Sequence, residues 1–169
     1  HVNNGGDIAL WTRETPLRLA ICEDPVLRAP GGRAVIGPGD GIGGVATSGW
    51  RGRSQSMGIA DAVTVLARDA ATADVAATLI ANAVDLPGHP AIARVPARDL
   101  APDSDLGARC VTTNVGPLAP DEARQALDAG HALAQDYIRR GLIRAACLAV
   151  AGQRRAIGDA ISQEEPEYA

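Results

Sequence analysis

The sequence predicts a single α+β domain, with a mixed, mainly antiparallel sheet and two helices packed against it. The first third of the chain alternates short apolar runs with glycine-rich turns, as a β-meander with antiparallel pairing does. Two longer stretches carry helix-start and helix-stop signals. In residues 70–84, Asp69 is the expected N-cap and the many alanines should pack tightly against the sheet. In residues 120–141, Pro120 with Asp121-Glu122 marks the start and Arg139-Arg140-Gly141 the end. No internal repeat or flexible linker divides the 169 residues, a length that suits one domain with its own core.

The strands and turns follow from alternation and from glycine and proline placement. Residues 4–7, Asn-Gly-Gly-Asp, supply the positive φ angles that a hairpin turn requires. We expect residues 91–109 to form a loop with a short helical turn. The domain is expected to end at residue 152, and residues 153–169 to form an acidic, flexible tail. Strands are expected at residues 8–11, 17–22, 33–36, 43–48, 59–67, 110–115 and 142–151.

Composition excludes several classes of function. Phe is absent and aromatic residues make up 2 % of the chain, so the core must consist of Ala, Val, Leu and Ile. All 16 basic residues are Arg, which excludes a lysine nucleophile and a Walker-type phosphate loop. The net charge is −4 and no basic stripe alternates with aromatic residues, so we expect no nucleic-acid partner. No apolar run reaches the roughly 18 residues that span a bilayer, so we expect no membrane partner.

The cysteines predict the cellular compartment of the protein, and the first residues predict whether the chain is part of a longer protein. Cys22, Cys110 and Cys147 are odd in number and widely spaced, which indicates reduced thiols and a cytoplasmic protein. The chain starts at His1, inside the motif HVNNGGDIALW. We therefore expect that the gene product is longer at its N-terminus, or that this chain was cut from a longer one. The missing N-terminal segment would then be a partner of this domain.

Three polar residues interrupt the otherwise apolar helix predicted at 70–84. Asp74, Thr78 and Asn82 are four residues apart, so they lie on one helix face. A carboxylate and a hydroxyl on such a face are oxygen ligands suited to Mg²⁺. The alternative is that this stripe is the solvent side of an amphipathic helix, and the stripe alone leaves both open.

A glycine-rich segment, SGWRGRS, follows the strand predicted at 43–48. Small residues at Ser48 and Gly49 allow a phosphate to approach the backbone, and Arg51 and Arg53 could pair with it. The alternative is an exposed loop. Ser48 has no evident His partner, which disfavours a serine nucleophile, and we expect His89 and His131 to be structural.

Three short motifs together resemble the ApbE superfamily, whose characterised members are FAD:protein FMN transferases. They are Asn4-Gly-Gly-Asp-Ile8, Val45-Ala-Thr-Ser-Gly49, and Ala73-Asp74 with Thr78 four residues on. Longer strings, GWRGRS, GIADAVTVLA, ATLIANAVDLPGHP and ARDLAPDSDLG, are similar to an uncharacterised branch of it, the uncharacterised protein family numbered two hundred and eighty. The resemblance extends to about Gly152 and implies an ApbE-like (T-fold-like) fold.

The resemblance also implies a site. The magnesium-binding Asp and Thr of the family correspond to Asp74 and Thr78. Its flavin-lining Gly-Gly-Asp corresponds to Gly5, Gly6 and Asp7, and its Ser-Gly turn to Ser48 and Gly49. The adjacent Thr47 is also expected to bind the cofactor. The implied cofactors are Mg²⁺ and FAD or another flavin nucleotide, and the implied reaction transfers FMN to a protein Thr.

One departure divides the functional hypotheses. The transferases carry His-x-x-Asp-Pro-x-x-Gly after the Ser-Gly turn, whereas residues 56–61 here read SMGIAD. The first hypothesis is a Mg²⁺-dependent flavin-nucleotide transferase or hydrolase. The second is a non-catalytic protein that binds a flavin or another small molecule. The third is a fragment that needs its N-terminal part before any site exists; homo-oligomerisation also stays open.

Overall fold

The computed structural model describes residues 1–24, 29–52 and 54–162 and confirms the α+β class. Three helices occur in this described part: α1 (Ala70–Ala83), α2 (Ala97–Leu100) and α3 (Pro120–Arg139). The main sheet has the strand order β1-β2-β5-β6-β9-β10. Every pair of neighbouring strands in it, among the described residues, is antiparallel. Its strands are β1 (Val2–Asn3), β2 (Ile8–Ala9), β5 (Gly44–Ser48), β6 (Ala62–Ala67), β9 (Ile143–Val150) and β10 (Gln153–Ile157).

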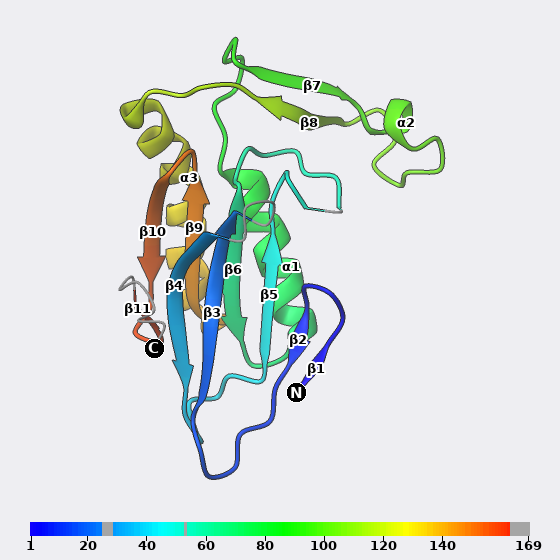
Figure 1. The fold of residues 1–169 in the computed structure, drawn as a ribbon. Helices are drawn as coiled ribbons and strands as arrows, with labels where there is room; N and C mark the ends of the chain where they lie inside the picture. The colour runs from blue at the N-terminus through cyan, green and yellow to red at the C-terminus, as the bar shows by residue number, and fades with distance from the viewer. Residues whose placement is uncertain (25–28, 53, 163–169) are drawn as a thin grey trace.

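Two smaller sheets complete the fold. One has the order β11-β4-β3, formed by β3 (Leu17–Asp24), β4 (Ala29–Ile36) and β11 (Ile161–Ser162). The other is a hairpin of β7 (Ile92–Pro96) and β8 (Cys110–Val115). Figure 1 shows this hairpin crossing above the end of the main sheet, beside α2. None of the helices formed by the described residues is long and apolar enough to cross a bilayer.

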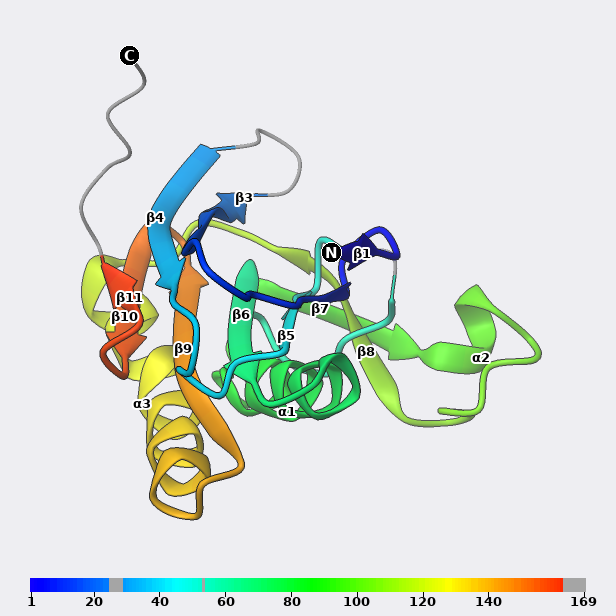
Figure 2. The same cartoon turned by 90° about the horizontal axis from the view of Figure 1, so that it is seen from below.

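The central strands are buried on both faces because different layers cover them. Figure 2 shows α1 and α3 on one side of the main sheet and β3 and β4 on the other. Side chains alternate along a strand, so Val63 and Val65 of β6 point to the helices and Leu66 points to the second sheet. On β9, Leu148 belongs to the helix-side core and Cys147 to the core between the sheets. This double cover accounts for the nearly continuous apolar sequences of β6 and β9.

Helix α1 begins and packs as the sequence predicted. Asp69 is its N-cap: Asp69 Oδ1 accepts a hydrogen bond from the backbone N–H of Thr72 at 2.7 Å, and this bond lowers the pKa of the Asp69 carboxyl. The buried face consists of Ile80 and four alanines, so the helix lies close to the sheet. The contact at Gly44 of β5 is too close for any side chain, since a Cβ placed there would lie 2.1 Å from the backbone nitrogen of Ala70.

Helix α3 also matches its prediction, from Pro120 at the first turn to the Arg139-Arg140-Gly141 end. Glu122 Oε2 accepts a hydrogen bond from the backbone N–H of Ala119 at 2.7 Å, which stabilises the helix start. The helix buries a stripe of small and branched residues against β9 and α1, namely Ala123, Ala126, Leu127, Gly130 and Ala134.

Two strand predictions were incomplete. The strand expected at 33–36 begins at Ala29, because residues 29–36 pair with β3 despite two irregularities in register. Residues 92–96, expected to lie in a loop, form β7. The sequence of β7 gives no clear alternation, because this strand pairs only with β8 and its residues are half-buried or exposed.

The domain boundary expected at residue 152 lies too early. Residues Gln153–Ile157 form β10, which pairs with β9 along its whole length, and residues Ile161–Ser162 pair with β4. The acidic end SQEEPEYA led to the prediction of a tail that begins at Gln153. Residues 153–157 are polar as well, but an edge strand needs an apolar face on one side only. Part of the expected tail, residues 163–169, lies outside the described residues.

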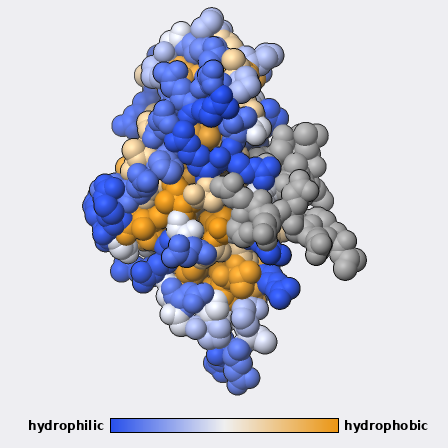
Figure 3. Space-filling model, turned by 90° about the vertical axis from the view of Figure 1, so that its left-hand side faces the viewer, coloured by the Kyte–Doolittle hydropathy of each residue, from blue (hydrophilic) through white to orange (hydrophobic). Residues whose placement is uncertain are grey.

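The surface differs between the hairpin and the body. Figure 3, seen from the left of Figure 1, shows apolar residues gathered near the middle of the molecule and mainly hydrophilic residues at the top, where the β7–β8 hairpin lies. Individual apolar side chains are exposed elsewhere, including Trp11 at 69 % and Val75 at 58 %.

We predict that Gly44→Ala strongly destabilises the protein. The new Cβ would meet the backbone at Asp69 and Ala70, which cannot move without displacing α1, so we expect a loss of about 3 kcal/mol in the free energy of unfolding. Denaturant unfolding monitored by circular dichroism measures it. Gly6→Ala is the control, because no heavy atom lies within 4 Å of a Cβ built there. Equal stability of the two variants would contradict this packing.

Candidate functional site

All eight residues that the sequence analysis assigned to the site line one cavity of about 550 Å³. The cavity is bounded by five segments: the turn between β1 and β2, Cys22 of β3, the end of β5 with the loop after it, Asp61 before β6, and the exposed side of α1. These segments are up to 74 positions apart in the sequence, since Asn4 and Thr78 both line it. The eight residues are Gly5, Gly6, Asp7, Thr47, Ser48, Gly49, Asp74 and Thr78.

The short edge strands account for the position of the cavity. The ladder between β2 and β5 consists of the pairs Ile8–Val45 and Ala9–Gly44. Thr47 and Ser48, at the end of β5, therefore have no ladder partner on β2. The chain turns away at Asp7 instead, and the turn and the strand end both contribute walls to the cavity.

Two members of the polar stripe on α1 belong to this cavity. Asp74 and Thr78 are one helical turn apart, are exposed on the helix surface and both line it. The Asp74 carboxylate makes no side-chain hydrogen bond or ion pair with another described residue. The side chains of Asp74 and Thr78 therefore line a concave site and do not simply face bulk solvent.

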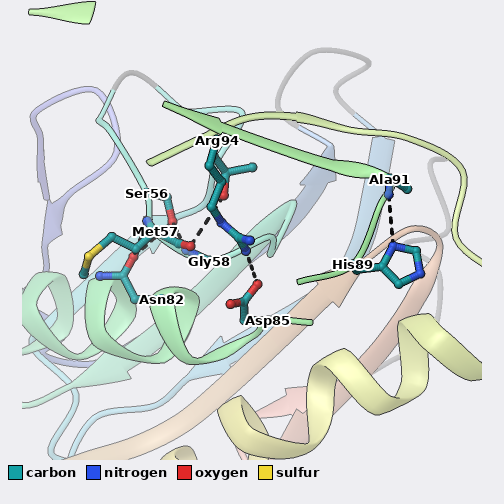
Figure 4. Close-up of polar contacts among 9 residues, drawn as sticks. Ser56, Met57, Gly58, Asn82, Asp85, His89, Ala91 and Arg94 are labelled. Atoms are coloured by element: carbon teal, nitrogen blue, oxygen red, sulfur yellow. Dashed lines mark hydrogen bonds and ion pairs between the residues drawn. The ribbon is translucent and has the colours of Figure 1, made fainter. Parts of the chain in front are cut away.

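The third member of the stripe has a structural role. Asn82 Oδ1 accepts hydrogen bonds from Ser56 Oγ at 3.1 Å and from the backbone N–H of Met57 at 2.9 Å, as Figure 4 shows. Gly58 packs against the carbonyl oxygen of Ala81, where a Cβ would come within 2.1 Å. Hydrogen bonds and close packing thus hold residues 56–58 against the end of α1. The ApbE transferases have their His-containing segment at this position in the sequence.

The loop after β5 is organised around Asp61, a residue that sequence reasoning did not select. Asp61 Oδ1 accepts hydrogen bonds from Trp50 Nε1 at 3.1 Å and Arg51 Nε at 3.0 Å, and Oδ2 accepts from the backbone N–H of Ala151 at 2.7 Å. Gly49 lies directly against the Asp61 backbone, since a Cβ at Gly49 would be 2.3 Å from its carbonyl oxygen. Arg51 lines the cavity, and Arg53 lies outside the described residues.

The site lacks a complete protein cage for a metal ion. Within residues 1–24, 29–52 and 54–162, no group of three or more His, Cys, Asp or Glu side chains is arranged to hold one. Mg²⁺ in proteins commonly uses one or two carboxylates and takes its other ligands from water and substrate phosphates. Asp74 and Thr78 fit this partial type of site, because an acidic and a hydroxyl oxygen donor face the same cavity.

A smaller apolar recess adjoins the polar cavity. It has a volume of about 120 Å³ and shares Gly6, Cys22 and Thr47 with the larger cavity. Its other walls are mostly apolar side chains from β2, β3, β4, β5 and β6. The hydroxyls of Thr47 and Thr64 form a hydrogen bond at 2.8 Å beside it. The combined space suits a ligand with a polar and an apolar part.

The histidines lie away from this cavity. His89 Nε2 donates to Glu122 Oε1 at 3.2 Å, and His89 Nδ1 accepts from the backbone N–H of Ala91, a contact visible in Figure 4. Nδ1 of His131 is buried without a hydrogen-bond partner among the described residues, and burial lowers the pKa of this imidazole. These contacts fit the structural roles expected for both.

Comparison with known families places the chain. A sequence model of the family described as "AbpE bacteria" matches residues 1–156. The chain belongs to this family. The match extends through all five segments of the cavity and most of β10.

Three of the similar proteins are described as UPF0280 proteins. The protein of Methanosphaerula palustris is 43 % identical over 84 residues, 49 % of this chain and 35 % of the relative. The proteins of Methanothrix thermoacetophila and Methanoculleus marisnigri are each 44 % identical, over 49 % of this chain and 35 % and 34 % of their own lengths. The match thus spans about a third of the length of these curated relatives. No solved structure matches the chain significantly.

We predict that Asn82→Ala loosens the segment at residues 56–58. The substitution leaves the buried Ser56 hydroxyl and the Met57 N–H without their acceptor, which should cost about 2 kcal/mol in the free energy of unfolding. Urea denaturation measures the change. Asn114→Ala, at an exposed position of β8, should change stability by less than about 0.5 kcal/mol. Equal effects would contradict the role of Asn82.

Proposed function

We propose that this chain is an ApbE-like domain that binds a flavin nucleotide together with Mg²⁺. The observation that carries the proposal is the cavity itself: a Gly-Gly-Asp turn, a Thr-Ser-Gly strand end and an Asp–Thr pair on α1 meet around one space. Its volume of about 550 Å³ is within the range of small-molecule sites. The adjoining apolar recess would receive part of a ring system, while the polar cavity receives phosphates.

Different residues of the cavity would bind the metal ion and the nucleotide. Asp74 and Thr78 would supply two oxygen ligands from one helix turn to the metal. Bound Mg²⁺ would neutralise charge on the nucleotide pyrophosphate and polarise its phosphorus–oxygen bonds. Gly5 and Gly6, without side chains, leave room for a ligand to approach the backbone of the β1–β2 turn.

The proposed reaction cleaves the pyrophosphate of FAD. An acceptor hydroxyl attacks the phosphorus of the FMN half, a new phosphorus–oxygen bond forms and AMP leaves with the electrons of the broken bond. If the acceptor is a Thr of a protein, the product is a flavinylated protein; if it is water, the product is free FMN. Asp7, half-buried in the cavity wall, is the candidate to receive the proton of the attacking hydroxyl.

The second candidate function is non-catalytic flavin or small-molecule binding. The segment at residues 56–61 favours it, because Asn82 fastens residues 56–58 to α1 and Asp61 is occupied by three hydrogen bonds. No His is found among the described residues that line the cavity. A binding protein would hold the nucleotide and release no AMP.

We predict that FAD binding depends on Mg²⁺ and that Asp74→Asn removes this dependence. Losing a carboxylate ligand should weaken FAD binding in the presence of Mg²⁺ by about tenfold or more, and leave metal-free binding unchanged. Titration calorimetry with and without Mg²⁺ measures both. Asp105→Asn, at an exposed loop position outside the cavity, is the matched control and should behave as the wild type.

The outcomes separate the two candidates. Mg²⁺-dependent binding with release of AMP, measured by chromatography, supports the enzyme. Binding without AMP release, whether or not Asp74 affects it, supports the binding protein. If FAD binds in neither condition, the flavin proposal is wrong for this chain.

A further inference from the structure

Arg51 is held rigidly at the wall of the cavity. Its Nε donates to Asp61 Oδ1 at 3.0 Å, and its guanidinium carbon lies 5.0 Å from the centroid of the Trp50 ring. One edge of the guanidinium is therefore hydrogen-bonded to Asp61, and one face stacks on the Trp50 ring. An arginine fixed in this way loses little conformational entropy when it binds an anion, so the site is preorganised.

Asp61 can hold Arg51 in a fixed orientation because the Asp61 carboxylate is itself hydrogen-bonded to the backbone. Its Oδ2 accepts from the N–H of Ala151, in the tight turn between β9 and β10 where Ala151 has a φ of 46°. Its Oδ1 accepts from both Trp50 Nε1 and Arg51 Nε. The Asp61 side chain is only 15 % exposed, whereas that of Arg51 is 34 % exposed. The carboxylate thus fixes the loop while the guanidinium keeps contact with the cavity.

The charged side chains around the cavity favour a ligand that carries both positive and negative charge. Asp7, Asp61 and Asp74 line it, together with Arg51. A bare anion would be repelled by the carboxylates, and a bare cation would not use the arginine. A phosphate that carries a divalent cation satisfies both, since the cation neutralises carboxylates and the guanidinium pairs with phosphate oxygens.

We propose that Arg51 binds a phosphate group of the ligand and that Asp61 is the positioning residue that aims it. The identity of that ligand as a flavin nucleotide rests on the proposed function. The same arrangement gives the site its specificity for phosphorylated over unphosphorylated flavins. Trp50 completes the support by stacking under the guanidinium.

The test compares ligands that differ only in phosphate. Riboflavin, FMN, FAD and inorganic pyrophosphate are titrated, each with Mg²⁺, into the wild type and Arg51→Met. We expect Arg51→Met to weaken FMN, FAD and pyrophosphate about 10- to 100-fold, as loss of a charged hydrogen bond does, and to leave riboflavin unchanged. Arg51→Lys, which keeps the charge without the fork, should recover part of the loss. Arg98→Met, outside the cavity on α2, is the control.

A double-mutant cycle tests the positioning role of Asp61. Asp61→Asn should weaken the phosphorylated ligands in the presence of Arg51 and have little further effect in Arg51→Met, while riboflavin affinity stays the same. A purely structural role would instead lower the affinity for every ligand, riboflavin included, in both backgrounds. That result would overturn the assignment of Asp61.

The design keeps this inference separate from the flavin proposal. If pyrophosphate binds through Arg51 and no flavin binds, the Arg51 assignment stands and the flavin proposal fails. If FAD binds equally to wild type and Arg51→Met, the flavin proposal stands and the Arg51 assignment is wrong. An equal loss for riboflavin and FMN in Arg51→Met also overturns it.

Discussion

The close packing of α1 on β5 and β6 is the constraint on which the site depends. The buried face of α1 is mainly alanine, and Gly44 touches the backbone at the helix start. A larger residue at Gly44 would lift the helix, and Asp74 and Thr78 would leave the cavity wall. The Asp69 cap then fixes the first turn, so the side chains on the exposed face keep their direction relative to the strand end at Thr47 and Ser48. The small side chains that make the sequence look featureless are therefore what brings the helix close to the sheet.

Strong local signals in the sequence were sufficient for part of the fold. Asp69 followed by an alanine-rich run predicted the start of α1, and Pro120 with its acidic first turn predicted α3. The Asn-Gly-Gly-Asp turn predicted the edge hairpin of β1 and β2. The eight candidate residues came from three motifs that are far apart in the sequence. The fold brings these motifs together, so that all eight residues line one cavity.

Other features are long-range and left no local signal. β10 is polar and half-buried, and only its pairing with β9 makes it a strand. β7 likewise depends on β8, and β4 extends beyond its apolar part because β3 is there to pair with it. Asp61 appeared as an ordinary residue before a buried strand. Its importance comes from Ala151, 90 positions later, and from the loop after β5, and no spacing rule connects these.

A crystal structure of the chain with Mg²⁺ and FAD tests the central claim most directly. The account predicts electron density for the metal at about 2.1 Å from an Asp74 carboxylate oxygen, with Thr78 beside it and the pyrophosphate between the metal and Arg51. FAD seated elsewhere would contradict it, for instance in the exposed apolar groove of α1 and α3 beside Val75, Leu79 and Leu142. In that case the cavity would be a structural feature of the fold and the flavin site would have to be sought on the other side of α1.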